Sequence, residues 1–225
     1  MTAGKEKQQK NSCDRCGGCC RQGGPALHSQ DRELVLNGFL RVEDLITVRR
    51  GEFALQPQTQ SPQPVTEEFL KVKGQGNDWC CRFYDHGGAA CTIYGHRPVA
   101  CGLLDCTHPE ELLAIAGRDL LSRFDLLTDD DPLLPLIRLH EEQCPCPQLA
   151  DLRDALAADK KGILEQLSRR VELDLAVRGK ATREFGLSVD RELFYFGRPL
   201  FQLLQQLGIT VSESMHGIQL AYRPG

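Results

Sequence analysis

Hydrophobic residues are distributed differently in the two halves of this 225-residue chain. Between residues 45 and 94 they occur in short runs separated by glycine, proline and polar residues, which is typical of short strands joined by turns. From residue 107 onward they recur every three to four positions, as along one face of an amphipathic helix. The pattern therefore predicts an α+β protein with a small, irregular first half of short strands and a mainly helical second half.

Turn-forming residues divide the first half into short elements. Ser29 can cap a short helix that ends at Asn37 and Gly38, and the sequence HGG at 86–88 predicts the turn of a hairpin. Proline and glutamine dominate residues 56–64, so we expect a loop there. The remaining apolar runs predict strands over residues 45–50, 65–73, 79–84 and 90–94.

Capping and breaking residues delimit the elements expected in the second half. The sequence THPE at 107–110 has a capping-box pattern and predicts a helix that includes Leu120 and Leu121. Regularly spaced leucines predict a long helical segment over residues 148–178, which Gly179 can end. We also expect helices over 133–142 and 198–206 and a final hairpin over 209–222.

Charge and hydropathy exclude two classes of partner. The formal net charge is −4, so no overall positive field attracts nucleic acid or an anionic membrane. No apolar stretch approaches the ~20 residues that span a bilayer. Residues 1–11 are rich in lysine and glutamine and lack an apolar core, so we expect a disordered tail rather than a secretory signal. We therefore expect a cytoplasmic protein.

The eleven cysteines change this picture. In a reducing compartment, a dense cysteine pattern indicates metal or redox chemistry more often than disulfides. The sequence CDRCGGCC at 13–20 places four thiols within eight residues, beside glycines that allow a tight loop. Further thiols follow in the sequences CTIY at 91–94 and RPVAC at 97–101. The eight thiols of interest are Cys13, Cys16, Cys19, Cys20, Cys81, Cys91, Cys101 and Cys106.

The spacing of these thiols suits a tetrahedral metal, because a CxxC turn places two sulfurs on one ion. Two such turns overlap at Cys16. Adjacent residues of an extended backbone point in opposite directions, so we expect Cys19 and Cys20 to serve different metals or one multi-iron cluster. Eight thiols suit two four-thiolate sites, or one iron–sulfur cluster with further ligands. Either centre would crosslink residues 13–20 to residues 81–106.

Together these motifs resemble the CxxCxxCC or YkgJ-like cysteine-cluster family, which is described as a zinc- or iron-chelating domain. The resemblance covers residues 13–106 and implies that the same eight cysteines are metal ligands, with zinc or iron, including an iron–sulfur cluster, as the cofactor. A flagellin lysine methylase carries a similar cysteine pattern. The helical region after residue 107 lies outside the shared motif, and the resemblance assigns it no function.

We therefore expect three regions: a disordered tail over 1–11, a cysteine-cluster metal-binding domain over 12–107, and a mainly helical region over 108–225 packed on it. Metal ions are the expected partners. If all eight thiols are ligands, the centre is structural and the domain is a binding module. The alternatives are an iron–sulfur-dependent redox or protein-modifying enzyme of the methylase type, and metal storage or delivery.

Other residues near the cysteines are weaker candidates. Arginines beside the ligands can balance thiolate charge: Arg15, Arg21, Arg82 and, the best placed, Arg97. Three histidines can complete a site or serve as caps and turns: His28, His86 and His108. Cys80 is expected to be a core thiol or a reserve ligand. Cys144 and Cys146 are separated by one residue, a spacing that places two sulfurs on one metal ion less well than CxxC does. A core role is therefore favoured over metal or redox chemistry.

Overall fold

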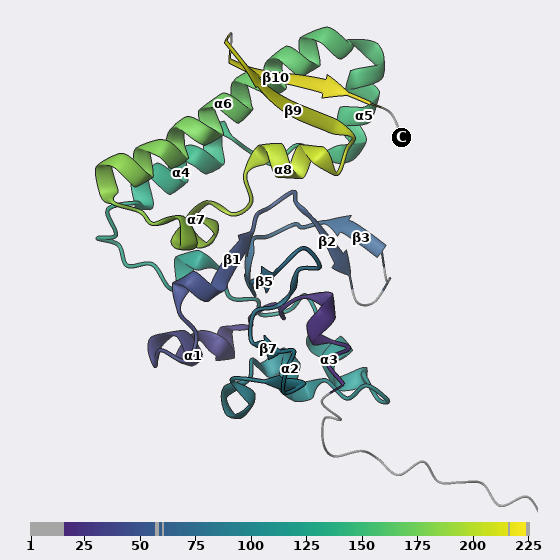
Figure 1. The fold of residues 1–225 in the computed structure, drawn as a ribbon, viewed down its shortest axis with the longest axis vertical. Coiled ribbons are helices and arrows are strands. Elements are labelled where there is room, and N and C mark those ends of the chain that lie inside the picture. The colour runs from purple at the N-terminus through teal and green to yellow at the C-terminus, as the bar shows by residue number, and fades with distance from the viewer. Residues whose placement is uncertain (1–15, 57–58, 60, 216, 224–225) are drawn as a thin grey trace, which may run out of the picture.

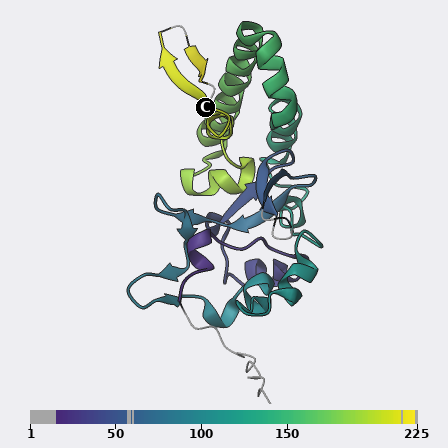
Figure 2. The same cartoon turned by 90° about the vertical axis from the view of Figure 1, so that its right-hand side faces the viewer.

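The computed structural model describes residues 16–56, 59, 61–215 and 217–223. Two views at right angles show two stacked halves (Figures 1 and 2). Short strands and short helices form the lower half, and longer helices with a C-terminal hairpin form the upper half. The predicted α+β class, with strands first and helices afterwards, is confirmed.

Every sheet formed by the described residues is an antiparallel pair of strands. In the lower half, the pairs are β1 (Leu45–Val48) with β4 (Phe69–Val72), β2 (Phe53–Gln56) with β3 (Ser61–Pro64), β5 (Gly74–Gln75) with β6 (Cys80–Cys81), and β7 (Tyr84–Asp85) with β8 (Ala90–Cys91). In the upper half, β9 (Ile209–Ser214) pairs with β10 (Gly217–Tyr222). The expected hairpins at 84–91 and 209–222 are confirmed.

The helices of the lower half are short. The α-helices are α1 (Arg32–Leu36), α2 (Val99–Leu103) and α3 (Glu110–Ile115). The 3-10 turns are η1 (Cys20–Gln22), η2 (Ser29–Asp31), η3 (Val42–Asp44), η4 (Tyr94–His96) and η5 (Arg123–Asp125). They connect the strand pairs and present the cysteine-bearing segments at the lower end of the molecule (Figure 1).

The upper half is built around one long helix. Its helices are α4 (Leu134–Gln143), α5 (Leu149–Ala158), α6 (Lys160–Phe185), α7 (Val189–Phe196) and α8 (Leu200–Gln205). The Asp159 carboxylate caps α6 by accepting from the Gly162 amide at 2.9 Å. Gly186 ends α6 in the left-handed conformation with φ 65°. Among the described residues, no helix combines the length and apolar character that a membrane span requires.

Several boundaries differ from the sequence predictions; for example, the strand expected over residues 79–84 is divided into β6 and β7. Residues 61–64 form β3 rather than part of a loop, because β3 is an edge strand and its prolines need not donate to a ladder. The helix expected at 107–121 ends at Ile115, and Leu121 instead exchanges backbone hydrogen bonds with Leu27 and Leu70 at 2.7–2.9 Å. The segment 148–178 is broken at Asp159, and the helix after it continues past Gly179.

The two halves share a hydrophobic core and a set of buried charges. One core cluster combines lower residues such as Leu45 and Leu70 with upper residues such as Ile137 and Phe196. Arg49 is fully buried, and its guanidinium pairs with Glu141 of α4 at 2.7 Å. Such a pair is stabilising only where hydrogen bonds replace water, and Arg49 also donates to the Cys144 carbonyl at 2.7 Å. The strand-rich half is therefore fixed against the helices.

The segment after the cysteine loop runs alongside β4. The Leu27 amide donates to the Leu70 carbonyl, and the Val72 amide donates to the Pro25 carbonyl, both at 2.9 Å. A Cβ on Gly24 would overlap the Val72 carbonyl, so only glycine allows this close approach. The rigid centre of the lower half thereby fixes where the cysteine loop begins.

Candidate metal centre

A glycine and a tyrosine shape the loop that carries the first cysteines. Gly17 has φ 72°, and a Cβ there would overlap the Tyr84 hydroxyl. The Tyr84 side chain is buried, and its ring packs directly on the loop backbone. The Gly17 carbonyl accepts from the Arg21 amide at 2.9 Å, which closes the turn. Glycine is therefore required at this position both by the backbone angle and by the contact.

The adjacent thiols of Cys19 and Cys20 lie side by side. Cys19 has helical angles, φ −68° and ψ −38°, and Cys20 begins η1. Their Sγ atoms are 3.9 Å apart. Two sulfurs bound to one tetrahedral zinc at ~2.3 Å lie about 3.8 Å apart, so this pair fits a single metal ion. The expectation that the two residues point in opposite directions is wrong, because the backbone there is helical rather than extended.

The downstream cysteines come from three elements of the lower half. Cys81 lies on β6 and pairs with Gly74 of β5, and Cys91 lies on β8 and pairs with Tyr84 of β7. Cys101 lies on α2. The start of α2 is held by the buried Asp31, whose carboxylate accepts from the Val99 amide at 2.8 Å. Tyr84 therefore links the first cysteine loop to the strand pair that carries Cys91.

Electrostatic interactions connect five of these thiols: Cys19, Cys20, Cys81, Cys91 and Cys101. Burial, followed by the neighbouring thiols of Cys19, Cys81 and Cys91, raises the pKa of Cys20 to about 12. Burial and the thiols of Cys81, Cys19, Cys20 and Cys91 likewise raise the pKa of Cys101. Ionisation of Cys20 and of Cys101 is thus opposed by thiols from other segments. A bound cation removes this repulsion, because it attracts every thiolate in the group.

The other three candidate ligands are placed differently. Cys16 is exposed, and its sulfur accepts from the Gly18 amide at 3.5 Å; Cys106 is also exposed. Cys13 lies outside the described residues. Within the part of the chain that the structure describes, no three histidine, cysteine or acidic side chains are already arranged to hold a metal ion. The donor chemistry and the Cys19–Cys20 spacing fit zinc or iron, but the complete ligand set is not assembled.

The arginines near the cysteines mostly have other partners. Arg97 stacks over the Tyr94 ring, with its Cζ atom 3.8 Å from the ring centre. Arg82 pairs with Asp44 at 3.0 Å and also donates to the Glu43 carbonyl. Arg21 acts on the Cys80 thiol, and Arg15 lies outside the described residues. Arg82 and Arg97 thus have partners other than the candidate ligands.

The three histidines occupy structural positions. His28 precedes η2, where its amide donates to Asp31, and its ring Nδ1 bonds to the Arg118 carbonyl at 2.9 Å. His86 lies edge-on to the Tyr84 ring. His108 contacts the Thr107 hydroxyl through Nδ1 at 2.9 Å. These contacts are those of cap and turn residues, which is the alternative to metal ligation for the three histidines.

The remaining thiols are buried outside this group. Cys80 is fully buried in the shared core. Cys144 and Cys146 lie in the second core cluster with Leu152, Leu167 and Val171. Burial raises the pKa of Cys144 to about 11 and that of Cys146 to about 12. The expected core role of Cys144 and Cys146 agrees with this placement.

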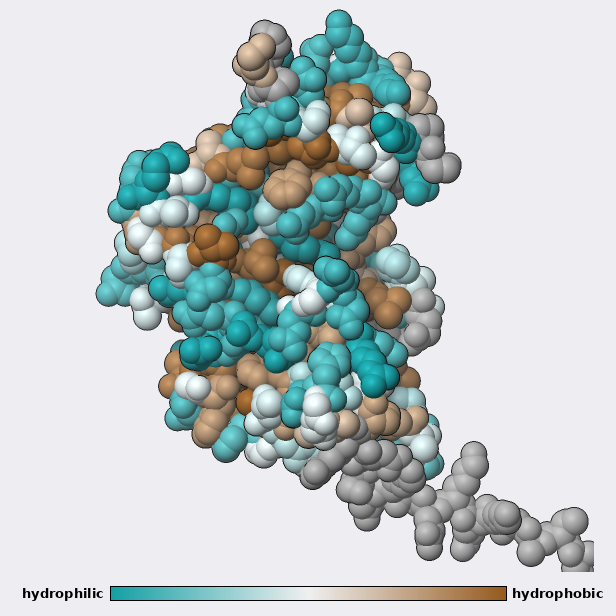
Figure 3. Space-filling view, in the orientation of Figure 1, coloured by the Kyte–Doolittle hydropathy of each residue, from teal (hydrophilic) through white to brown (hydrophobic). Residues whose placement is uncertain are grey.

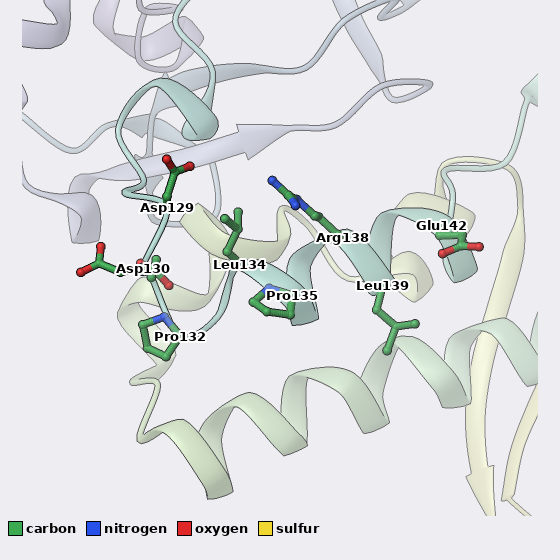
Figure 4. A pocket seen from close by; sticks show the side chains of 9 residues that line it. Asp129, Asp130, Pro132, Leu134, Pro135, Arg138, Leu139 and Glu142 are labelled. Carbon is green, nitrogen blue, oxygen red and sulfur yellow. The ribbon is translucent and has the colours of Figure 1, made fainter.

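An open groove lies apart in the sequence from the eight candidate ligands. It encloses about 650 Å³ beside the loop Asp129–Asp131 and one side of α4. Its labelled side chains splay along the loop and the helix rather than converging on one point (Figure 4). The Asp131 carboxylate is already used, since it accepts from the Leu133 amide at 2.8 Å. On the face shown in Figure 3, apolar side chains gather instead over the upper half and where the halves meet.

Sequence reasoning missed Lys71 of β4. Its side chain is half-buried beneath the cysteine loop, and its ammonium interacts with the Cys81 thiol. No local signal identifies it, because a single lysine in a predicted strand is most simply a solvent-facing residue.

Residues 12–117 match the model of the CxxCxxCC family, which is described as a "Putative zinc- or iron-chelating domain". The resemblance predicted from the cysteine motifs is therefore confirmed for this segment, which makes up slightly less than half of the chain. No curated protein and no solved structure matches the chain.

Proposed function

We propose that the chain binds zinc or iron through eight cysteine thiolates, in a centre that holds more than one metal ion. The ligands are Cys13, Cys16, Cys19, Cys20, Cys81, Cys91, Cys101 and Cys106. The observation that carries this proposal is the 3.9 Å separation of the Cys19 and Cys20 Sγ atoms, together with the thiols of Cys81, Cys91 and Cys101 that interact with Cys20 or Cys19 from distant segments. Metal binding itself is the property by which the matched family is described.

More than one metal ion follows from the number of thiols. One tetrahedral zinc ion takes four ligands, and five thiols already interact in the described part of the centre. Cys13, Cys16 and Cys106 extend the set to eight. Eight thiolates suit two four-thiolate zinc sites, or one iron–sulfur cluster with additional ligands.

The chemistry of the thiols supports a cation as the group that completes the site. Cys20, Cys81 and Cys101, whose pKa values are raised by burial and by neighbouring thiols, remain protonated at neutral pH in the metal-free protein. Zinc or iron would displace these protons and supply the positive charge that lets the thiolates coexist. The protein's contribution is to hold sulfurs from the loop, the strand pairs and α2 at one place.

Anaerobic purification tests the proposal. We expect the full-length protein to retain zinc or iron at more than one ion per chain. Brown protein with charge-transfer absorbance would assign an iron–sulfur cluster, and colourless protein with zinc would assign the thiolate sites. Protein that retains no metal, and binds none when reduced metal-free chain is titrated with zinc or iron, contradicts the proposal.

A second candidate function, metal storage or delivery, is favoured by the exposure of the site. Cys16 and Cys106 are exposed, and Cys19, Cys20, Cys91 and Cys101 are partly exposed, so solvent reaches several candidate ligands. A sealed structural zinc site would hide its sulfurs. Delivery predicts that a mild chelator removes the metal while the fold persists, and a structural site predicts unfolding with metal loss.

A further inference from the structure

Lys71 is placed beneath the first cysteine loop. It lies on β4, where its backbone pairs with Ile46 and forms a bridge to Ala26 on the other side. Gly23 ends η1, and a Cβ on Gly23 would lie 3.5 Å from the Lys71 Nζ and 3.8 Å from its Cε. The half-buried lysine side chain therefore underlies the turn that immediately follows Cys19 and Cys20.

The Lys71 ammonium has no acidic partner among the residues that the structure describes. Burial and Arg198 lower its pKa, and the Cys81 thiol is the group that opposes them. Lys73, two residues further along, provides the contrast. Its Nζ donates to the Asp190 carbonyl, and Asp190, Asp44 and Glu43 all favour its charge. Of these two neighbouring lysines, one has acidic neighbours, and the other lies beside Gly23 of the cysteine loop and interacts electrostatically with Cys81.

A half-buried cation without a carboxylate is costly unless another negative group faces it. Four thiolates around one divalent ion carry a net charge of about −2, which also requires compensation. The Lys71 ammonium would supply positive charge to the thiolates, and the thiolates would supply negative charge to the ammonium. Two arginines near the cysteines are less available for this role, because Arg82 is held by Asp44 and Arg97 by the Tyr94 ring.

We propose that Lys71 is the charge-balancing residue of the metal centre, whose ammonium offsets the negative charge of the coordinated thiolates and strengthens metal binding. The inference rests on the proposed function, since it requires a metal–thiolate centre. Lys71 is a positioning and electrostatic residue rather than a ligand, because its charged amine has no lone pair to donate.

The test compares four full-length proteins: the wild type, Lys71→Met, Lys71→Arg and Lys73→Met. Zinc(II) is titrated into each reduced, metal-free protein in competition with a chromophoric chelator. Lys71→Met should weaken zinc binding about tenfold or more, the effect typical of removing a group that supports metal ligands. Lys71→Arg keeps the charge and should stay within about threefold of the wild type, as should the matched control Lys73→Met.

Rescue by arginine separates electrostatics from packing, because a purely structural role would not depend on charge. If Lys71→Met does not fold, Lys71→Gln replaces it, since its polar end is better tolerated beside solvent. Zinc binding by the neutral variant within about threefold of the wild type overturns the role of Lys71 while the metal centre stands. A wild type that binds no zinc or iron overturns the proposed function and this inference with it.

Discussion

Two groups of cysteines in this protein have opposite surroundings. In the lower half, Cys19, Cys20, Cys81, Cys91 and Cys101 come from separate segments and have one another as neighbours. In the upper half, Cys144 and Cys146 are close in sequence and are buried among leucine and valine side chains. All these residues carry the same thiol. The comparison teaches that the structural neighbours of a thiol separate candidate ligands from core residues in the same way as the sequence spacing does.

The charges around the two groups differ as well. Cys146 lies beside Arg49, Glu52, Glu141 and Arg198, which are buried or partly buried charges already paired with one another. The lower group has other thiols and the Lys71 ammonium as its ionisable neighbours. A cation brought to the upper group would disturb a balanced set of ion pairs, whereas a cation brought to the lower group would relieve repulsion.

The largest expected effect is loss of metal after replacement of one lower thiol. Cys20→Ser removes one sulfur of the pair whose Sγ atoms are 3.9 Å apart, and we expect the bound metal per chain to fall by half or more. Elemental analysis of the purified protein measures this. The control Cys144→Ser should keep the wild-type metal content. Equal metal loss in both variants would break the distinction between the two groups.

A smaller effect is expected from acidification. The raised pKa values of Cys20, Cys81 and Cys101 mean that these thiols are protonated in the metal-free protein at neutral pH. Metal must displace those protons, so affinity rises with pH and falls as the solution is acidified, by about tenfold per pH unit for each proton displaced.

Chelator competition at several pH values checks this dependence. The variant Cys146→Ala should show the same slope as the wild type, because its thiol binds no metal. A zinc affinity that does not change with pH would mean that the lower thiols are not the ligands.

Gly17→Ala should have a moderate effect on the loop. The new Cβ would overlap the Tyr84 hydroxyl, and the left-handed φ of 72° costs a non-glycine residue about 1–2 kcal/mol. We expect lower thermal stability and weaker zinc binding. Gly18→Ala is the matched control, because its Cβ would meet only the Cys16 sulfur at an ordinary 3.6 Å. Equal effects of the two substitutions would contradict the role assigned to Tyr84.

The smallest expected effect concerns the upper thiols. Cys146→Ala removes one buried sulfur from the second core and should reduce the free energy of unfolding by about 1 kcal/mol. Metal content should not change. Chemical denaturation and elemental analysis of the same preparation measure both quantities, and a loss of metal would show that the upper pair belongs to the centre.

Local patterns predicted much of the fold. The hairpin at 84–91 follows from its glycine turn, and the existence of the helices follows from leucine spacing. The strand β3 was missed because proline usually marks a loop, yet an edge strand tolerates Pro62 and Pro64. The end of the long helix at Gly186 was missed because Gly179 offered an earlier stop, and burial of Ala181 in the shared core favours helix beyond it.

The candidate centre was predictable in its residue types but not in its geometry. The cysteine motifs identify the thiols, since their spacing is unusual in an apolar core. The direction of Cys19 and Cys20 depends on the backbone angles of one residue, which Gly17 and Tyr84 set through a contact between distant segments. Lys71 likewise gains its position only when the loop folds over β4, a contact that no local pattern encodes.

X-ray absorption at the metal edge tests the central claim most directly, because it reports both the ligand atoms and any second metal nearby. For full-length protein purified without oxygen, we predict a shell of sulfur atoms at about 2.3 Å around the metal and a second metal in a further shell. Bound metal surrounded only by nitrogen and oxygen, or no metal at all, would contradict a multi-metal thiolate centre in the lower half.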